Sequence, residues 1–130
     1  MYQRTLAKRV SITGIGIHSG KKVTLVLHPA EANTGIRFRR TDLENVPSIR
    51  ASVKTVGATE NNTTLGDGEN SVHTVEHLLS VLYGLGIDNV LCEIDGPEVP
   101  IMDGSGASFV YILKETGITN LGASKKFFLV

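Results

Sequence analysis

The first 56 residues consist of short runs in which apolar or β-branched residues alternate with polar ones, and turn-forming residues separate these runs. In one run, Val23, Leu25 and Leu27 would share one face of a strand, while Thr24 and His28 lie on the other. This period of two is typical of half-buried antiparallel strands, because one face packs on a core and the other meets solvent. The strands predicted in this way are 5–13, 22–27, 36–39 and 49–56.

The period changes to that of an α-helix in two later stretches. The first predicted helix begins near Asn70 or Ser71, whose short polar side chains suit a helix N-cap, and ends at Gly84 or Gly86. The second follows the capping segment 103–106 and continues to about Thr116, where Gly117 supplies a stop. Further strands are predicted at 89–94 and 126–130.

This order of elements predicts an α+β fold, a two-layer sandwich with two main helices packed on one face of a mostly antiparallel sheet. A chain of 130 residues, 41% of them apolar, can bury one hydrophobic core. We therefore expect a single domain covering residues 1–130. Because the sequence stops on the apolar run 126–130, we also expect it to have been cut at a boundary between two domains.

Charge and apolar content exclude several classes of partner. Thirteen basic residues balance thirteen acidic ones and no block of like charge stands out, so binding to nucleic acid or to an anionic membrane is not expected. The longest apolar stretch, 78–83, is interrupted by Ser80 and is too short for a transmembrane segment. The single cysteine, Cys92, cannot form an internal disulfide and should be inert in the core. A cytoplasmic protein is the simplest expectation.

Candidate catalytic residues lie on the first predicted helix. At 3.6 residues per turn, His73, Glu76, His77 and Ser80 would form one stripe, opposite a buried apolar side. A neutral imidazole is a good zinc ligand, and a neighbouring carboxylate can accept a proton from a zinc-activated water. The pattern therefore indicates zinc-dependent hydrolysis.

The spacing alone leaves alternatives open. His73-x-x-Glu76-His77 also matches the H-x-x-E-H pattern of inverted zinc peptidases, in which both histidines bind the metal. The stripe could equally be the solvated face of an ordinary helix, or the contact surface of a non-catalytic protein-binding module. The glycines of Gly14-x-Gly16-x-x-x-Gly20 have the wrong spacing for a dinucleotide-binding loop and predict a tight turn instead.

Several longer segments carry a resemblance to a known family. They are 74–80 (Thr-Val-Glu-His-Leu-Leu-Ser), 84–90 (Gly-Leu-Gly-Ile-Asp-Asn-Val), 97–105, 14–20 and 33–38. These segments occur along the chain in the family's order, and over its whole length the sequence resembles the amino-terminal half of the zinc-dependent UDP-3-O-acyl-N-acetylglucosamine deacetylases. That family removes the acetyl group from the glucosamine nitrogen during lipid A and lipopolysaccharide biosynthesis in Gram-negative bacteria.

The resemblance implies roles for particular residues. His77 corresponds to the zinc ligand contributed by this half, and Glu76 to the general base. The remaining zinc ligands come from a carboxy-terminal domain that is absent here, so we expect an incomplete zinc site and an inactive fragment. The resemblance implies that the family does not use a histidine at the position of His73. His18 is expected near the cleft, and Asn62 and Thr63 in a loop along the approach to the metal, as substrate-binding residues.

Overall fold

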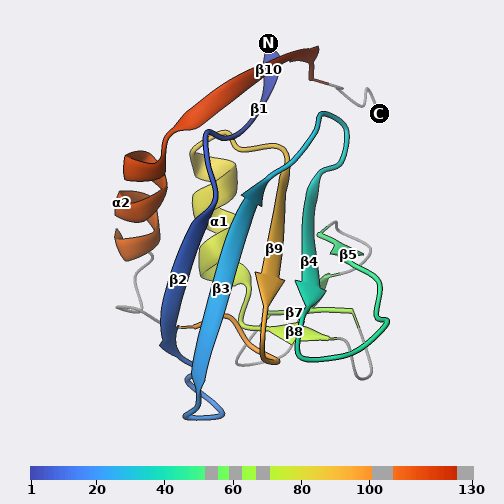
Figure 1. Cartoon of the computed structure of the whole chain (residues 1–130), viewed down its shortest axis with the longest axis vertical. Coiled ribbons are helices and arrows are strands. Elements are labelled where there is room, and N and C mark those ends of the chain that lie inside the picture. The colour runs from blue at the N-terminus through green and yellow to red at the C-terminus, as the bar shows by residue number, and fades with distance from the viewer. Residues whose placement is uncertain (52–55, 59–62, 67–70, 101–106, 126–130) are drawn as a thin grey trace.

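The computed structural model describes residues 1–51, 56–58, 63–66, 71–100 and 107–125 (Figure 1). Its elements in chain order are β1 (Tyr2–Leu6), β2 (Val10–Ile15), β3 (Lys22–Pro29), β4 (Ile36–Arg40), β5 (Ile49–Arg50), β6 (Val56–Ala58), β7 (Thr63–Leu65), β8 (Val72–His73), α1 (Glu76–Gly84), β9 (Val90–Ile94), α2 (Ala107–Thr116) and β10 (Ile118–Ser124).

The main sheet has five strands in the order β2-β3-β9-β4-β5. Its neighbours run antiparallel, apart from β4 and β9, which are parallel. In β3 the predicted alternation holds, because Val23, Leu25 and Leu27 are buried whereas Thr24 and His28 are half-buried. The sheet therefore has one face for a core and one that meets solvent.

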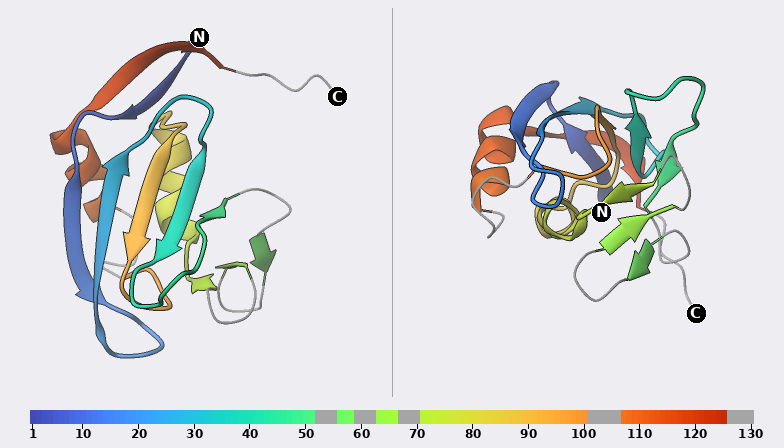
Figure 2. Two further views of the ribbon diagram at one scale, coloured as in Figure 1. Left: turned by 45° about the vertical axis from the view of Figure 1, so that its right-hand side comes forward. Right: turned by 90° about the horizontal axis from the view of Figure 1, so that it is seen from below.

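Both helices lie on the same face of this sheet (Figures 1 and 2). Leu78, Leu79 and Leu82 of α1 and Phe109 and Leu113 of α2 are buried in the same core as the inner side chains of the strands. The second helix ends at Thr116 as predicted, and Gly117 follows with φ +93°, a conformation that favours glycine. The predicted α+β sandwich with its mostly antiparallel sheet is confirmed.

The predicted strand 5–13 is wrong, because this run divides into β1 and β2, which belong to separate sheets. The chain turns at Ala7, Lys8 and Arg9, which are all exposed. β1 then pairs with β10, a strand that the sequence analysis did not predict. The strand predicted at 126–130 lies outside the described residues.

The first helix begins at Glu76 and not at residue 70 or 71. The backbone of His73 instead pairs with the segment after β9: its N–H donates to Pro97 O at 2.7 Å, and its carbonyl accepts from Val99 N at 3.0 Å. Thr74 follows with φ +62°. The predicted helical stripe through His73, Glu76 and His77 is therefore wrong, because a long-range β pairing holds His73 in an extended strand.

The predicted strand 49–56 is also wrong as one element. Residues 49–50 form β5 in the main sheet, whereas β6 joins β7 and β8 in a separate sheet of three strands. Residues 52–55 lie outside the described part of the chain. Among the helices that the structure describes, none is long and apolar enough to cross a membrane.

The segment before β9 holds the sheet to β1 through side-chain hydrogen bonds. Asp88 Oδ2 accepts from Arg4 N at 2.8 Å. Asn89 is 1% exposed, and its Oδ1 accepts from Gly35 N at 2.9 Å while its Nδ2 donates to Gln3 Oε1 at 3.0 Å. Asn89 therefore joins three distant segments inside the protein.

Replacement of Asn89 should lower stability markedly. Asn89→Ala leaves the Gly35 N–H without its acceptor and removes one of the two donors to Gln3 Oε1, and a buried polar group without its partner costs about 1–3 kcal/mol. The free energy of unfolding, measured by urea denaturation, should fall by at least that amount. Asn120→Ala is the matched control, because the Asn120 side chain is exposed and accepts a local hydrogen bond from Gly122 N, so the effect should stay within about 0.5 kcal/mol. Equal losses in the two variants would contradict this account.

Candidate active site

Glu76 and His77 are the first two residues of α1. Both are half-buried, whereas Leu78, Leu79 and Leu82 of the same helix are buried. The aliphatic residues anchor the helix to the sheet, and the carboxylate and imidazole lie where the helix meets the surface. A carboxylate in the first turn also suits the partial positive charge of a helix N-terminus. Glu76 and His77 are therefore neighbours on an α-helix and partly accessible to solvent, which agrees with the expected helical position of this pair.

His73 lies apart from this pair, in β8. Its backbone pairs with β7 on one side and with Glu98 on the other. Its Nε2 lies 3.4 Å from Ser71 Oγ. The H-x-x-E-H arrangement of zinc peptidases needs both imidazoles one turn apart on one helix, and the structure does not form it.

A pocket of about 340 Å³ opens beside this strand. His18 and Ser19 from the turn between β2 and β3 form one wall, and His73, Pro97 and Glu98 form the other. The pocket therefore brings two imidazoles together from segments 55 residues apart, one of which, His18, was predicted as substrate-binding. Asn62 lies outside the described residues, and for Thr63 only the backbone is described, in β7.

The sequence analysis missed Glu98, which is 2% exposed. Its Oε1 accepts hydrogen bonds from the backbone N–H groups of His18 at 3.0 Å and Ser19 at 2.9 Å. Its Oε2 accepts from Thr74 Oγ1 at 3.3 Å. Burial raises the pKa of the Glu98 carboxyl, but the bonds from Ser19 and His18 and the nearby His18 ring together lower it below the ordinary value.

Two backbone features fit this carboxylate. A Cβ atom on Gly16 would overlap with Glu98 Oε1, so glycine at this position lets the carboxylate lie against the turn. Thr74 is β-branched and adopts φ +62°, a conformation that costs on the order of 1–3 kcal/mol and needs support from its surroundings. A glutamate within an apolar run, together with a distant glycine-rich turn, is the signal from which this contact could have been suspected.

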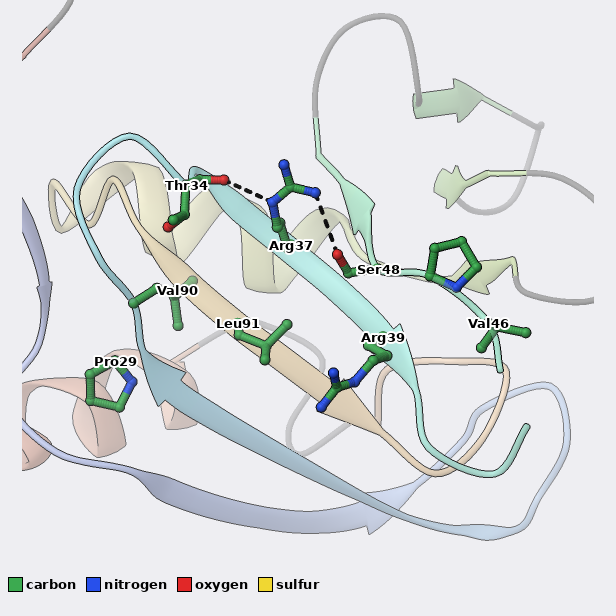
Figure 3. A pocket seen from close by; sticks show the side chains of 10 residues that line it. Pro29, Thr34, Arg37, Arg39, Val46, Ser48, Val90 and Leu91 are labelled. Atoms are coloured by element: carbon green, nitrogen blue, oxygen red, sulfur yellow. Dashed lines mark hydrogen bonds between the residues drawn. The ribbon is translucent and has the colours of Figure 1, made fainter. Parts of the chain in front are cut away.

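A second hollow of about 360 Å³ lies on the opposite, outer face of the sheet (Figure 3). Arg37 and Arg39 of β4 line it, and Arg37 is held by Thr34 O at 3.0 Å and Ser48 Oγ at 3.4 Å. The side chains of β4 alternate, so these arginines point away from the buried residues of the same strand. His18, Glu76 and His77, the predicted site residues whose side chains the structure describes, do not line this hollow.

A complete metal site is not formed within the described part of the chain, where no three His, Cys, Asp or Glu side chains come together. Catalytic zinc generally needs three protein ligands and one open position. The accessible imidazole of His77 beside the carboxylate of Glu76 fits one ligand and one base, and further ligands would have to come from elsewhere.

The Glu98 carboxylate should make stability depend on pH in acid. Because its folded-state pKa lies below the ordinary value of 4.5, its contribution is fully present above that pH and is lost as the pH falls through the folded-state pKa. Urea denaturation at several pH values below 5 should therefore show a shallower fall in stability for Glu98→Gln than for the wild type. Parallel curves for the two proteins would refute the assignment.

Comparisons with known proteins show the family to which the sequence is similar. A family model described as UDP-3-O-acyl N-acetylglycosamine deacetylase matches residues 3–130. A UDP-3-O-acyl-N-acetylglucosamine deacetylase of Geobacter sp. (strain M21) is 49% identical over 130 residues, which are 100% of this chain and 43% of the relative. The protein of the same name from Legionella pneumophila (strain Corby) is 52% identical over 125 residues, 96% of this chain and 41% of the relative. The chain spans less than half of these relatives, and it belongs to the UDP-3-O-acyl-N-acetylglucosamine deacetylase family.

Proposed function

We propose that this chain is the amino-terminal part of a zinc-dependent deacetylase that hydrolyses the N-acetyl group of UDP-3-O-acyl-N-acetylglucosamine in lipid A biosynthesis. The observation that carries the proposal is the accessible pair Glu76 and His77 in the first turn of α1. The names of the relatives, which match over nearly the whole chain, support the choice of substrate.

In this proposal His77 supplies one zinc ligand through its imidazole, and Glu76 acts as the general base. When bound, zinc would polarise the amide carbonyl and make a water molecule more acidic. Glu76 takes a proton from the water that attacks the carbonyl carbon, and then delivers it to the nitrogen as the C–N bond breaks. Acetate and the free amine of the sugar are the products.

The pocket beside β8 supports a role in binding the rest of the substrate. His18 and His73 contribute imidazole groups that can form hydrogen bonds there. The substrate-binding role of Asn62 and Thr63 stays a prediction from the resemblance.

The remaining zinc ligands belong, in this proposal, to the part of the relatives that this chain does not cover. The coverage of 43% of the Geobacter protein leaves room for a second domain of similar size. The chain alone is then inactive, and the enzyme works in the cytoplasm, where its nucleotide-sugar substrate is made.

Replacement of the base should separate catalysis from metal binding. In the full-length protein, Glu76→Gln should lower kcat on the order of 10²- to 10⁴-fold while the zinc content stays unchanged, because only proton transfer is lost. His77→Ala should lower both. Acetate release from UDP-3-O-acyl-N-acetylglucosamine and metal analysis measure the two quantities.

Matched controls come from the outer face of the sheet. His28 and Glu93 are paired there, with 2.6 Å between Nε2 and Oε1, away from the pocket. His28→Ala and Glu93→Gln should leave kcat and zinc content unchanged. Normal turnover by Glu76→Gln would show that α1 is not the catalytic helix, and would favour a protein-binding role for its surface.

The requirement for a second domain can be tested by reassembly. The 130-residue chain should release no acetate by itself, and mixing it with the separately produced remainder of the protein should restore zinc-dependent release. Turnover by the chain alone would contradict the proposal that the other ligands lie outside it.

A further inference from the structure

The position of His18 depends on a contact outside its own turn. Residues 16–21 close on themselves through two backbone bonds, from Gly16 N to Lys21 O at 2.9 Å and from Gly20 N to Gly16 O at 2.8 Å. The side chains at the tip of this turn, at positions 17–19, are all exposed. Side-chain packing therefore does not hold the tip of the turn in place. The hydrogen bonds from the backbone N–H groups of His18 and Ser19 to Glu98 Oε1 hold it.

The other oxygen of the same carboxylate reaches the start of the catalytic helix. Oε2 accepts from Thr74, the residue with positive φ that separates β8 from α1. A β-branched residue keeps this conformation only where its surroundings impose it. Glu98 thus contacts both the turn that carries His18 and the bend that precedes Glu76 and His77.

The backbone of Glu98 strengthens this connection. It forms a β-bridge with His73, flanked by the bonds to Pro97 O and Val99 N. The side chain and the main chain of one residue therefore hold three segments that are far apart in the sequence.

We propose that Glu98 is a positioning residue of the deacetylase, whose carboxylate holds His18 at the pocket in a fixed relation to the start of α1. The inference rests on the proposed function, since it assigns to His18 a contact with the substrate. Glu98 itself is buried against the turn and acts through the residues that it holds.

The charge of the carboxylate is needed for this role. Two backbone donors share one oxygen, and bonds to an ionised acceptor are roughly twice as strong as neutral ones. Glu98→Gln keeps the shape but removes the charge, and Glu98→Ala removes all three bonds. Gly16→Ala disturbs the same contact from the other side, because the added Cβ would overlap with Oε1.

The first test is a double-mutant cycle in the full-length protein. Glu98→Ala should lower kcat/KM about 10- to 100-fold, with Glu98→Gln between it and the wild type. In a His18→Ala background the same change should have a smaller effect, because the part that acts through His18 is already lost and only the contact with Thr74 remains. Gly16→Ala should behave as Glu98→Ala does, and Glu93→Gln on β9 should match the wild type.

The second test does not depend on activity. In the wild type, the backbone amide protons of His18 and Ser19 should resonate downfield and exchange slowly in NMR spectra, and Glu98→Gln should reduce both effects without changing the amides of β9. Unchanged His18 and Ser19 amides, or additive losses in the cycle, would overturn the role of Glu98. Absence of acetate release by the wild type would instead refute the proposed function, while the amide signals would still report on the contact.

Discussion

The backbone pairing of His73 with the segment after β9 decides where α1, the helix of the candidate site, begins. The bonds to Pro97 O at 2.7 Å and from Val99 N at 3.0 Å hold β8 extended, so a helix cannot form before Thr74. Glu76 and His77 consequently occupy the first turn, where helix N–H groups have no partner within the helix and point outward. If the helix began near residue 70, the same two residues would lie in its middle.

The sequence predicted elements whose signal is local. The alternation in β3, the strand β9 and the end of α2 at Thr116 follow from periods and stop signals that lie within a few residues. It failed where a distant segment decides. β10 pairs with β1 across more than 100 residues. His73 has the spacing of a helical stripe with Glu76 and His77, yet in the structure it lies in β8 and its backbone pairs with residues 97–99. No window along the chain contains those partners.

The same distinction applies to the candidate site. Glu76 and His77 were recognisable as neighbours on a helix, and the structure places them at its accessible end. Glu98 has no local pattern, because its partners are backbone N–H groups that lie 80 and 79 positions earlier. The glycine pattern of the turn was read correctly as a tight turn. That Gly16 leaves space for the buried carboxylate of Glu98 could not be predicted, because only the folded structure brings the two residues together.

The energetics of the site explain why it depends on the sheet. The positive φ at Thr74 costs free energy of folding on the order of 1–3 kcal/mol. Desolvation of the Glu98 carboxylate adds a cost, which its hydrogen bonds from His18 and Ser19 offset. Such features persist only where a well-packed core holds the surrounding segments. Here Leu78, Leu79 and Leu82 fix α1 to the sheet, and Asn89 joins the start of β9 to β1. The aliphatic core thus stabilises a polar arrangement that would not form by itself, and leaves Glu76 and His77 half-buried at the first turn of α1.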